Sequence, residues 1–182
     1  MCSSDLAVGR PVPTDLYRYA SGGAAPVRML LNGRETPLAT KKGYAMLDRA
    51  WRSGDTVELD LPMPARRVLA HEKVKDDAGL VAVERGPLVY CVEGADHQGQ
   101  VQNLALPDGA DFALTARPDL LGGITVIDAA GRRLAGDNPS RVEPASLRFI
   151  PYYAWNHRGV GAVTVWLPRT APAARPPYDT SK

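Results

Sequence analysis

Apolar and polar residues alternate along short stretches of the chain, and turn-forming residues separate these stretches. In the stretch TVELDL, Val57, Leu59 and Leu61 fall on one side of an extended chain, and the two acidic residues between them fall on the other. This period of two predicts a half-buried β-strand. Comparable extended runs recur along the chain, at residues 27–31, 34–38, 43–51, 80–85, 88–93, 112–116, 123–129, 145–150 and 162–167.

Turn signals divide these runs into strands. Asn32-Gly33 is a strong hairpin signal, and Gly86-Pro87 separates two later strands in the same way. No long amphipathic helical pattern with a capping signal occurs in the sequence. A spacing of about ten residues between turns is typical of sandwiches and barrels. We therefore expect an all-β fold, an antiparallel β-sandwich region without a helical catalytic barrel.

A change in composition along the sequence also predicts a division of the chain into units. Residues 94–103 are polar and carry no strand pattern, so they are expected to connect two small sandwich units. The first unit is predicted over residues 16–93, incomplete at its start, and the second over residues 104–168. Residues 1–15 are expected to be an irregular or non-native start. Residues 169–182, rich in Pro and Ala, are expected to be a disordered tail.

Composition and charge exclude several partners. The 182 residues are 45% hydrophobic and 23% charged, as is usual for a globular domain. Twenty-two basic and 20 acidic residues give a net charge of +2, and the basic residues are scattered, so a nucleic-acid partner is not expected. The apolar runs are far shorter than the roughly 20 residues of a membrane-spanning helix. The chain shows no secretory signal. We expect a soluble protein with no membrane partner, in a compartment that the sequence does not identify.

The residues that could carry chemistry show no catalytic or metal-binding spacing. Cys2 and Cys91 are far apart, and Cys91 lies in an apolar run, which favours a buried small hydrophobe over a thiol nucleophile. His71, His97 and His157 share no short spacing with one another or with a cysteine, so each is expected to be structural or solvent-facing.

Glycoside hydrolysis needs two carboxylates close together in space, and Glu84 and Glu93 are named as candidates for such a pair. The sequence gives no further support for them, because spacing along a β-protein does not show which acids converge. Taken alone, the residues therefore support no catalytic, cofactor or metal site.

Several sequence blocks, read in order, resemble the C-terminal β-sandwich region of the β-L-arabinofuranosidase-type glycoside hydrolases of family 127. The resemblance covers about residues 16 to 168, and its blocks are LLNG, GYAMLDRAWRSGDTVELDLPMP, GLVAVERGPLVYCVEGADH and IPYYAWNHRGVGAVTVWLP. Within them, the matching positions are Asn32, Gly33, Tyr44, Arg49, Trp51, Gly54, Asp55, Leu61, Pro62, Met63, Arg85, Gly86, Pro87, Leu88, Val89, Tyr90, Pro151, Tyr152, Tyr153, Ala154 and Trp155.

The resemblance implies that catalysis belongs to a part of the protein that this sequence does not contain. In that family a helical barrel precedes the sandwich region and carries a zinc-bound cysteine nucleophile and a glutamate acid/base. No segment here matches the barrel, so none of these residues is carried over, Cys91 included, and no cofactor is expected in this chain. Where the family pattern begins with a strand of the type Arg-Ile-Pro-x-Trp, this chain has DLYRYAS. We expect the C-terminal piece of a larger glycosidase with an altered start.

The aromatic block at residues 150–168 has three interpretations. As a strand, it would place Tyr152 and Ala154 on one face and Tyr153 and Trp155 on the other, with at least one face buried. The favoured interpretation is packing in the core or against another domain, with contact beside a partner barrel's active site and an independent sugar platform as the alternatives. The candidate domain-interface residues are Tyr152, Tyr153, Trp155 and Arg158.

Three functions follow from these observations. The leading one is a non-catalytic accessory sandwich that braces the catalytic barrel or mediates oligomer contacts, so the expected partners are that barrel and a second copy of the chain. The second is a self-standing carbohydrate-binding module, favoured if Trp51, Tyr152 or Trp155 is exposed and coplanar in a groove. The third is an active hydrolase, which would require two convergent sandwich carboxylates, one with a raised pKa.

Overall fold

In a computed structural model, residues 16–20, 26–42, 44–135, 141–171 and 174 are described. These residues form strands and three short 3-10 helices, and no α-helix occurs among them. The first strands are β1 (Tyr17–Tyr19), β2 (Arg28–Leu31), β3 (Arg34–Thr36), β4 (Ala39–Lys41), β5 (Tyr44–Met46), β6 (Val57–Asp60) and β7 (Ala65–Ala70). After η1 (Lys75–Asp77) come β8 (Leu80–Arg85), β9 (Leu88–Glu93) and η2 (Gly94–Asp96). The rest are β10 (Leu104–Ala105), β11 (Phe112–Arg117), β12 (Ile124–Leu134), β13 (Val142–Pro151), η3 (Tyr152–Ala154), β14 (Val163–Thr164) and β15 (Leu167–Pro168).

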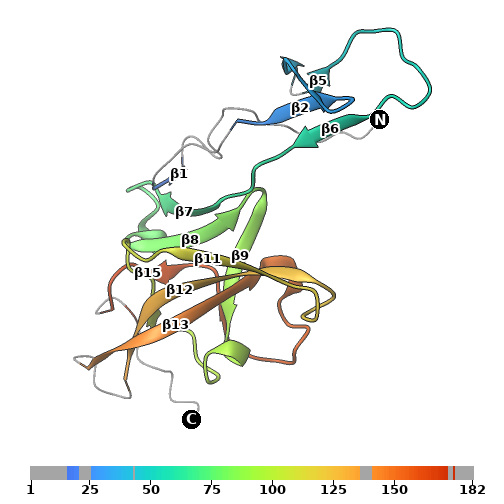
Figure 1. Ribbon diagram of the computed structural model, residues 1–182. Helices are drawn as coiled ribbons and strands as arrows, with labels where there is room; N and C mark the ends of the chain where they lie inside the picture. The colour runs from blue at the N-terminus through green and yellow to red at the C-terminus, as the bar shows by residue number, and fades with distance from the viewer. Residues whose placement is uncertain (1–15, 21–25, 43, 136–140, 172–173, 175–182) are drawn as a thin grey trace.

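The expected all-β antiparallel fold is confirmed. A ten-stranded sheet runs in the order β1-β7-β8-β9-β13-β12-β10, with β11 on β12, β14 on β9 and β15 on β8, and every pairing is antiparallel (Figure 1). Its longest pairing joins β12 to β13, from Ile127 opposite Phe149 to Leu134 opposite Val142. The described residues include no helix that is long and apolar enough to cross a membrane.

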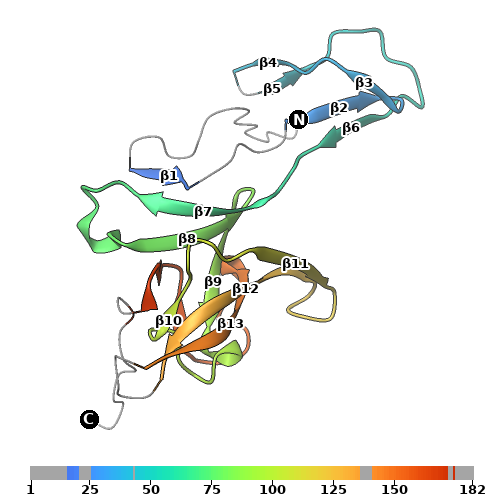
Figure 2. The same cartoon turned by 60° about the vertical axis from the view of Figure 1, so that its left-hand side comes forward.

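A smaller β region lies at the other end of the molecule. It contains the three-stranded sheet β3-β2-β6 and the hairpin β4-β5 (Figure 2). The hairpin expected at Asn32-Gly33 joins β2 to β3, and both residues have positive φ, at 51° and 75°. Two successive positive φ values are what a two-residue hairpin turn of the right twist requires, and asparagine and glycine adopt them most easily. The Asn32 amide also donates to Asp55 Oδ1 at 2.8 Å, which ties the turn to the start of β6.

The main core lies inside the large sheet, where its strands bend round on one another. It is built from side chains of β8, β9, β12 and β13, and its largest members, Tyr90 and Phe149, are fully buried. Phe112 of β11 meets Phe149 edge-on, with the ring centroids 6.4 Å apart. The long β12–β13 ribbon and the β8–β9 hairpin are therefore the frame to which the surface loops are attached.

Strand pairing does not break at the connector expected between residues 94 and 103. β9 precedes that segment and pairs with β13 and β14, which follow it. The segment itself is packed, because Gly94 and Val101 are buried within it. The units 16–93 and 104–168 therefore share one sheet, and the smaller β region ends at β6.

Two further expectations differ from the structure in their burial. The alternating strand at β6 was expected to be half-buried, yet Val57 and Leu61 of its apolar side are 45% and 42% exposed. In the segment expected to be a disordered tail, Ala171 and Ala174 are buried with Leu134, and Arg169 donates to Asp108. Packing therefore continues beyond residue 168, and the remainder of the expected tail lies outside the described residues, as does the expected irregular start at 1–15.

Candidate functional site

The aromatic block after β13 forms a 3-10 turn, which corrects the expectation of a strand. β13 ends at Pro151, and the backbone N–H of Trp155 donates to the carbonyl of Tyr152 at 3.2 Å to close the turn. Because a 3-10 turn has three residues, side chains three apart lie on the same side. Tyr152 therefore stacks on Trp155, with centroids 6.0 Å apart and planes 22° from parallel. The strand interpretation had paired Tyr152 with Ala154.

The same turn buries one residue and exposes two. Ala154 is 4% exposed and packs with Cys91 and Ile150 beneath the turn. Tyr152 and Tyr153 are 44% and 61% exposed. The favoured interpretation was packing in the core or against another domain. Ala154 packs in the core, the rings of the two tyrosines lie at the surface, and packing of those rings against another domain stays a prediction.

Arg158, the fourth candidate interface residue, is held in a buried ion-pair cluster. Its guanidinium donates to Glu93 Oε2 at 2.5 and 3.0 Å and to both carboxylate oxygens of Asp96 at 2.5 and 3.0 Å. The hydrogen bonds to Asp96, and those to Glu93, raise the pKa of Arg158. Glu93 is only 6% exposed and also accepts from the backbone N–H of Asn156 at 2.7 Å. The cluster therefore anchors the loop that follows the aromatic turn to the end of β9.

The histidines are structural or at the surface, as expected. His97 is buried, with Nδ1 2.7 Å from the carbonyl oxygen of Glu93, while its Nε2 accepts from the backbone N–H of Arg148 at 3.1 Å. Because Nε2 is an acceptor, the ring is neutral and carries its proton on Nδ1. Burial lowers the pKa of His97 and so favours the same form. His157 Nδ1 lies 3.1 Å from the carbonyl oxygen of Ala154, and His71 is exposed.

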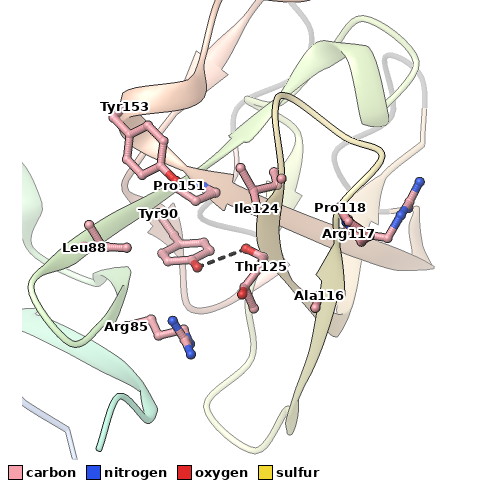
Figure 3. A pocket seen from close by; sticks show the side chains of 11 residues that line it. Arg85, Leu88, Tyr90, Ala116, Arg117, Pro118, Ile124, Thr125, Pro151 and Tyr153 are labelled. Atoms are coloured by element: carbon pink, nitrogen blue, oxygen red, sulfur yellow. Dashed lines mark hydrogen bonds between the residues drawn. The ribbon is translucent and has the colours of Figure 1, made fainter. Parts of the chain in front are cut away.

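An open cavity of about 450 Å³ lies beside the aromatic turn (Figure 3). It is lined by residues of β8, β9, β11, β12, β13, the loop between β11 and β12, and the aromatic turn, namely Arg85, Leu88, Tyr90, Ala116, Arg117, Pro118, Gly123, Ile124, Thr125, Pro151 and Tyr153. The buried Tyr90 lies beneath it and donates its hydroxyl to the carbonyl of Thr125 at 3.0 Å. Burial raises the pKa of that hydroxyl. The cavity is thus mostly apolar, with few polar groups, as small-molecule sites usually are.

The cavity was not foreseen from the sequence, although five of its residues, Arg85, Leu88, Tyr90, Pro151 and Tyr153, lie in blocks that carry the family resemblance. Arg85 belongs to the RGPLVY block and Tyr153 to the PYYAW block, which are 68 residues apart. The pairing of β9 with β13, in which Pro151 lies opposite Tyr90, brings them together. No local spacing rule reports such a long-range pairing.

Glu84 and Glu93 do not form a carboxylate pair. Glu84 accepts a hydrogen bond from the Tyr19 hydroxyl at 3.2 Å, and Arg66 lies over the ring of that tyrosine. Burial raises the pKa of Glu84. Glu93 is instead bound by Arg158, and neither acid lines the cavity. The two acids therefore do not provide the convergent pair that a sandwich-based hydrolase would require.

The residues described here do not fit the zinc centre that the family resemblance implies for the barrel. Cys91 is fully buried, and burial, together with the nearby Glu93 carboxylate, raises the pKa of its thiol to about 12. A zinc ligand or nucleophile must be a thiolate, so this environment opposes both roles. Within the described part of the chain, no group of three His, Cys, Asp or Glu residues could hold a metal ion. The expectation that Cys91 is a small buried hydrophobe is confirmed.

Comparison with known proteins accounts for nearly all of the described chain. A family model described as the glycoside hydrolase family 127 C-terminal domain matches residues 65–168, and one described as the β-L-arabinofuranosidase, GH127 middle domain matches residues 11–63. A non-reducing end β-L-arabinofuranosidase of Bifidobacterium longum subsp. longum is 38% identical in an alignment 154 residues long, and the match covers 76% of this chain and 23% of that protein.

Solved structures agree with these matches. A GH127 β-arabinofuranosidase is 38% identical with a TM-score of 0.82, over 90% of this chain and 26% of its own. A GH127 β-L-arabinofuranosidase from Geobacillus stearothermophilus T6 is 37% identical with a TM-score of 0.71, over 84% of this chain and 26% of its own. This chain thus spans about a quarter of the length of these relatives. It belongs to glycoside hydrolase family 127, and its two β regions correspond to the middle and C-terminal domains of that family.

Proposed function

We propose that this chain is a non-catalytic accessory region of a β-L-arabinofuranosidase-like enzyme and that it braces the catalytic part through the aromatic turn. The observation that carries the proposal is the exposure of Tyr152 and Tyr153 on a turn that is rigidly held from below. Aromatic rings provide much of the binding energy at protein interfaces, since each one buries a large area.

The anchoring of the turn supports a binding role for its rings. Ala154 is inserted into the core, and Arg158 binds the following loop to Glu93 and Asp96. Rings that are fixed before contact lose little conformational entropy on binding. The stacked Tyr152–Trp155 pair therefore offers a preformed apolar surface to a partner.

The partner that we propose is the part of the enzyme that this chain does not cover. The matched relatives are about four times as long as their matched region, and their names describe arabinofuranosidases. Within the described part of the chain, Glu84 and Glu93 do not converge and Cys91 is buried with a raised thiol pKa, so these residues give no support to hydrolysis by the sandwich itself.

An experiment in trans tests the proposal. The chain is mixed with the remainder of the Bifidobacterium longum relative, produced without its matched quarter, and binding is measured by analytical ultracentrifugation. Binding is expected, with Tyr152→Ala weakening it about tenfold or more. Val160→Ala is the matched control, because Val160 is fully exposed but lies outside the turn.

Two results would contradict the proposal: no association at any concentration, or equal affinity for wild type and Tyr152→Ala. The isolated chain should also hydrolyse no aryl β-L-arabinofuranoside. Turnover that disappears in Glu84→Gln or Glu93→Gln would assign catalysis to the sandwich itself.

A self-standing carbohydrate-binding module is the second candidate, because Trp51 is 53% exposed. Arg49 lies 5.4 Å from the centre of its ring. The Tyr152–Trp155 pair stacks face to face and is not coplanar along a groove, so it favours the bracing role instead. Retardation of the chain in arabinan-containing gels, lost in Trp51→Ala, would support the binding module.

A further inference from the structure

The cavity beside the aromatic turn contains a cation without a matching anion. Arg85 and Arg117 are the charged residues that line it, and its lining includes no Asp or Glu. Arg117 points away from the cavity in Figure 3, and it binds Asp119 with N···O distances of 2.7 and 2.9 Å. Arg85 therefore provides the positive charge of the cavity.

The Arg85 guanidinium is poorly satisfied by the protein. Its Nε is buried without a hydrogen-bond partner, its Nη1 makes a long contact of 3.9 Å with Met63 Sδ, and its further polar neighbour is the uncharged hydroxyl of Tyr90. Among the described residues, no carboxylate lies within ion-pair distance of it, whereas Arg158 and Arg169 each bind one. Burying a charged group in part without a counter-ion is costly, so an anionic ligand would be favoured here.

The other walls of the cavity fit a saturated ring. Tyr153 is 61% exposed and borders the cavity with Pro151 and Leu88 (Figure 3). An aromatic face and apolar walls match the C–H face of a pyranose, whose hydroxyls can remain in water. The volume of about 450 Å³ lies within the usual range for small-molecule sites.

We propose that this cavity binds a hexuronic acid, with the sugar ring against Tyr153 and its carboxylate on Arg85. A guanidinium binds a carboxylate through charge-assisted hydrogen bonds, and a single guanidinium balances one negative charge. A sugar phosphate carries closer to two charges and would need a second cation, which Arg117 does not supply because it is already paired with Asp119. The proposal names a ligand class for the second candidate function, the carbohydrate-binding module. It does not depend on the bracing role.

Titration of the whole chain tests the site. Heteronuclear NMR follows the amides of residues 85–90 and 151–153 as D-galacturonate, D-galactose, galactose 6-phosphate or N-acetylglutamate amide is added. Galacturonate is expected to shift these amides and to bind about tenfold more tightly than galactose, because galactose lacks the carboxylate. N-acetylglutamate amide presents a protein-like carboxylate without a sugar ring and should bind more weakly than galacturonate.

Variants separate the two contacts. Arg85→Gln should reduce galacturonate binding to the level of galactose, and Arg141→Gln should not, because the Arg141 side chain is 71% exposed and does not line the cavity. Tyr153→Ala should weaken both sugars. Tyr44→Ala is its matched control, because Tyr44 of β5 is a tyrosine of 48% exposure that does not line the cavity. Thermal unfolding of each variant shows whether it is folded, and Tyr153→Ala tests the site even if Arg85→Gln does not fold.

Several results would overturn the inference. These are an absence of shifts at the cavity with galacturonate, equal affinity for galactose, tighter binding of the phosphate or of the glutamate amide, and full binding in folded Arg85→Gln. Arabinan carries no carboxylate, so its retardation tests the Trp51 binding module separately from this site.

Discussion

Arg158 and Glu93 are 65 residues apart in sequence, and the guanidinium of the first binds the buried carboxylate of the second at 2.5 Å. Glu93 is the last residue of β9, and Arg158 lies in the loop after the aromatic turn. Their pairing fixes that loop where β13 and β14 both reach β9. This ion pair, together with the pair between Arg158 and Asp96, therefore helps to attach the region that we propose for binding to the frame of the sheet.

Removing Arg158 should destabilise the protein strongly. Arg158→Met leaves the Glu93 carboxylate buried with only the Asn156 N–H as a hydrogen-bonding partner, and breaking a buried pair in this way costs about 3 kcal/mol or more. Urea unfolding followed by tryptophan fluorescence measures the loss.

The control for this prediction is Arg28→Met. Arg28 binds Asp60 at 3.1 Å, but their side chains are 54% and 48% exposed, and such surface pairs contribute about 0–1 kcal/mol. Equal losses in the two variants would mean that the Arg158 cluster is no more important for stability than a surface pair.

His97 should make the folded state less stable at mildly acidic pH. Its folded-state pKa lies below the ordinary value of about 6.5, because the ring is buried. The unfolded chain therefore binds the proton more readily, so the stability from His97 is complete above pH 6.5 and decreases as the pH falls from there toward the folded-state pKa. Unfolding free energies measured between pH 7.5 and 5 should show this decrease.

His97→Gln should lower stability at pH 7.5 and flatten the pH dependence over the same interval. His71→Gln should leave both unchanged, because His71 is exposed. A pH dependence that is the same in wild type and His97→Gln would assign the effect to another group.

Cys91 should be unreactive in the folded protein. It is fully buried, and its thiol pKa of about 12 leaves almost no thiolate at pH 8. In a Cys2→Ser background, Ellman's reagent should react with Cys91 only after denaturant is added. Rapid labelling of the native protein at pH 8 would show that the strand containing Cys91 opens readily or that its environment is polar.

The fold class could be predicted from local sequence patterns, whereas the cavity and the Arg158 cluster could not. Period-two alternation and the Asn32-Gly33 turn depend on neighbouring residues, so the strands and the first hairpin were predictable. The contact between Glu93 and Arg158, and the cavity between Arg85 and Tyr153, depend on β9 pairing with β13. Since that pairing joins distant parts of the sequence, no local pattern reports it.

The aromatic turn shows how a local pattern can also mislead. Residues 145–150 alternate as a strand, and the expected strand continued through Tyr152 and Trp155. Pro151 ends β13, and the chain then turns with a period of three, which places Tyr152 beside Trp155. The role of these residues as a domain interface stays a prediction, and their expected grouping was wrong because the period changes at the proline.

Replacing Gly131 of β12 should destabilise the β12–β13 ribbon. A Cβ at Gly131 would lie 2.4 Å from Leu147 Cγ and 3.0 Å from the carbonyl oxygen of Ala105, and Leu147 is fully buried. Gly131→Ala should therefore cost about 1–3 kcal/mol of unfolding free energy, since a packed core does not accept an extra methyl group without strain.

Gly109→Ala is the matched control, because a Cβ there meets no atom within 4 Å. In a Leu147→Ala background, where Cγ and Cδ1 of Leu147 are gone, Gly131→Ala should cost much less, and the double-mutant cycle in urea measures the difference. Equal costs of Gly131→Ala in both backgrounds would show that Leu147 does not cause the strain.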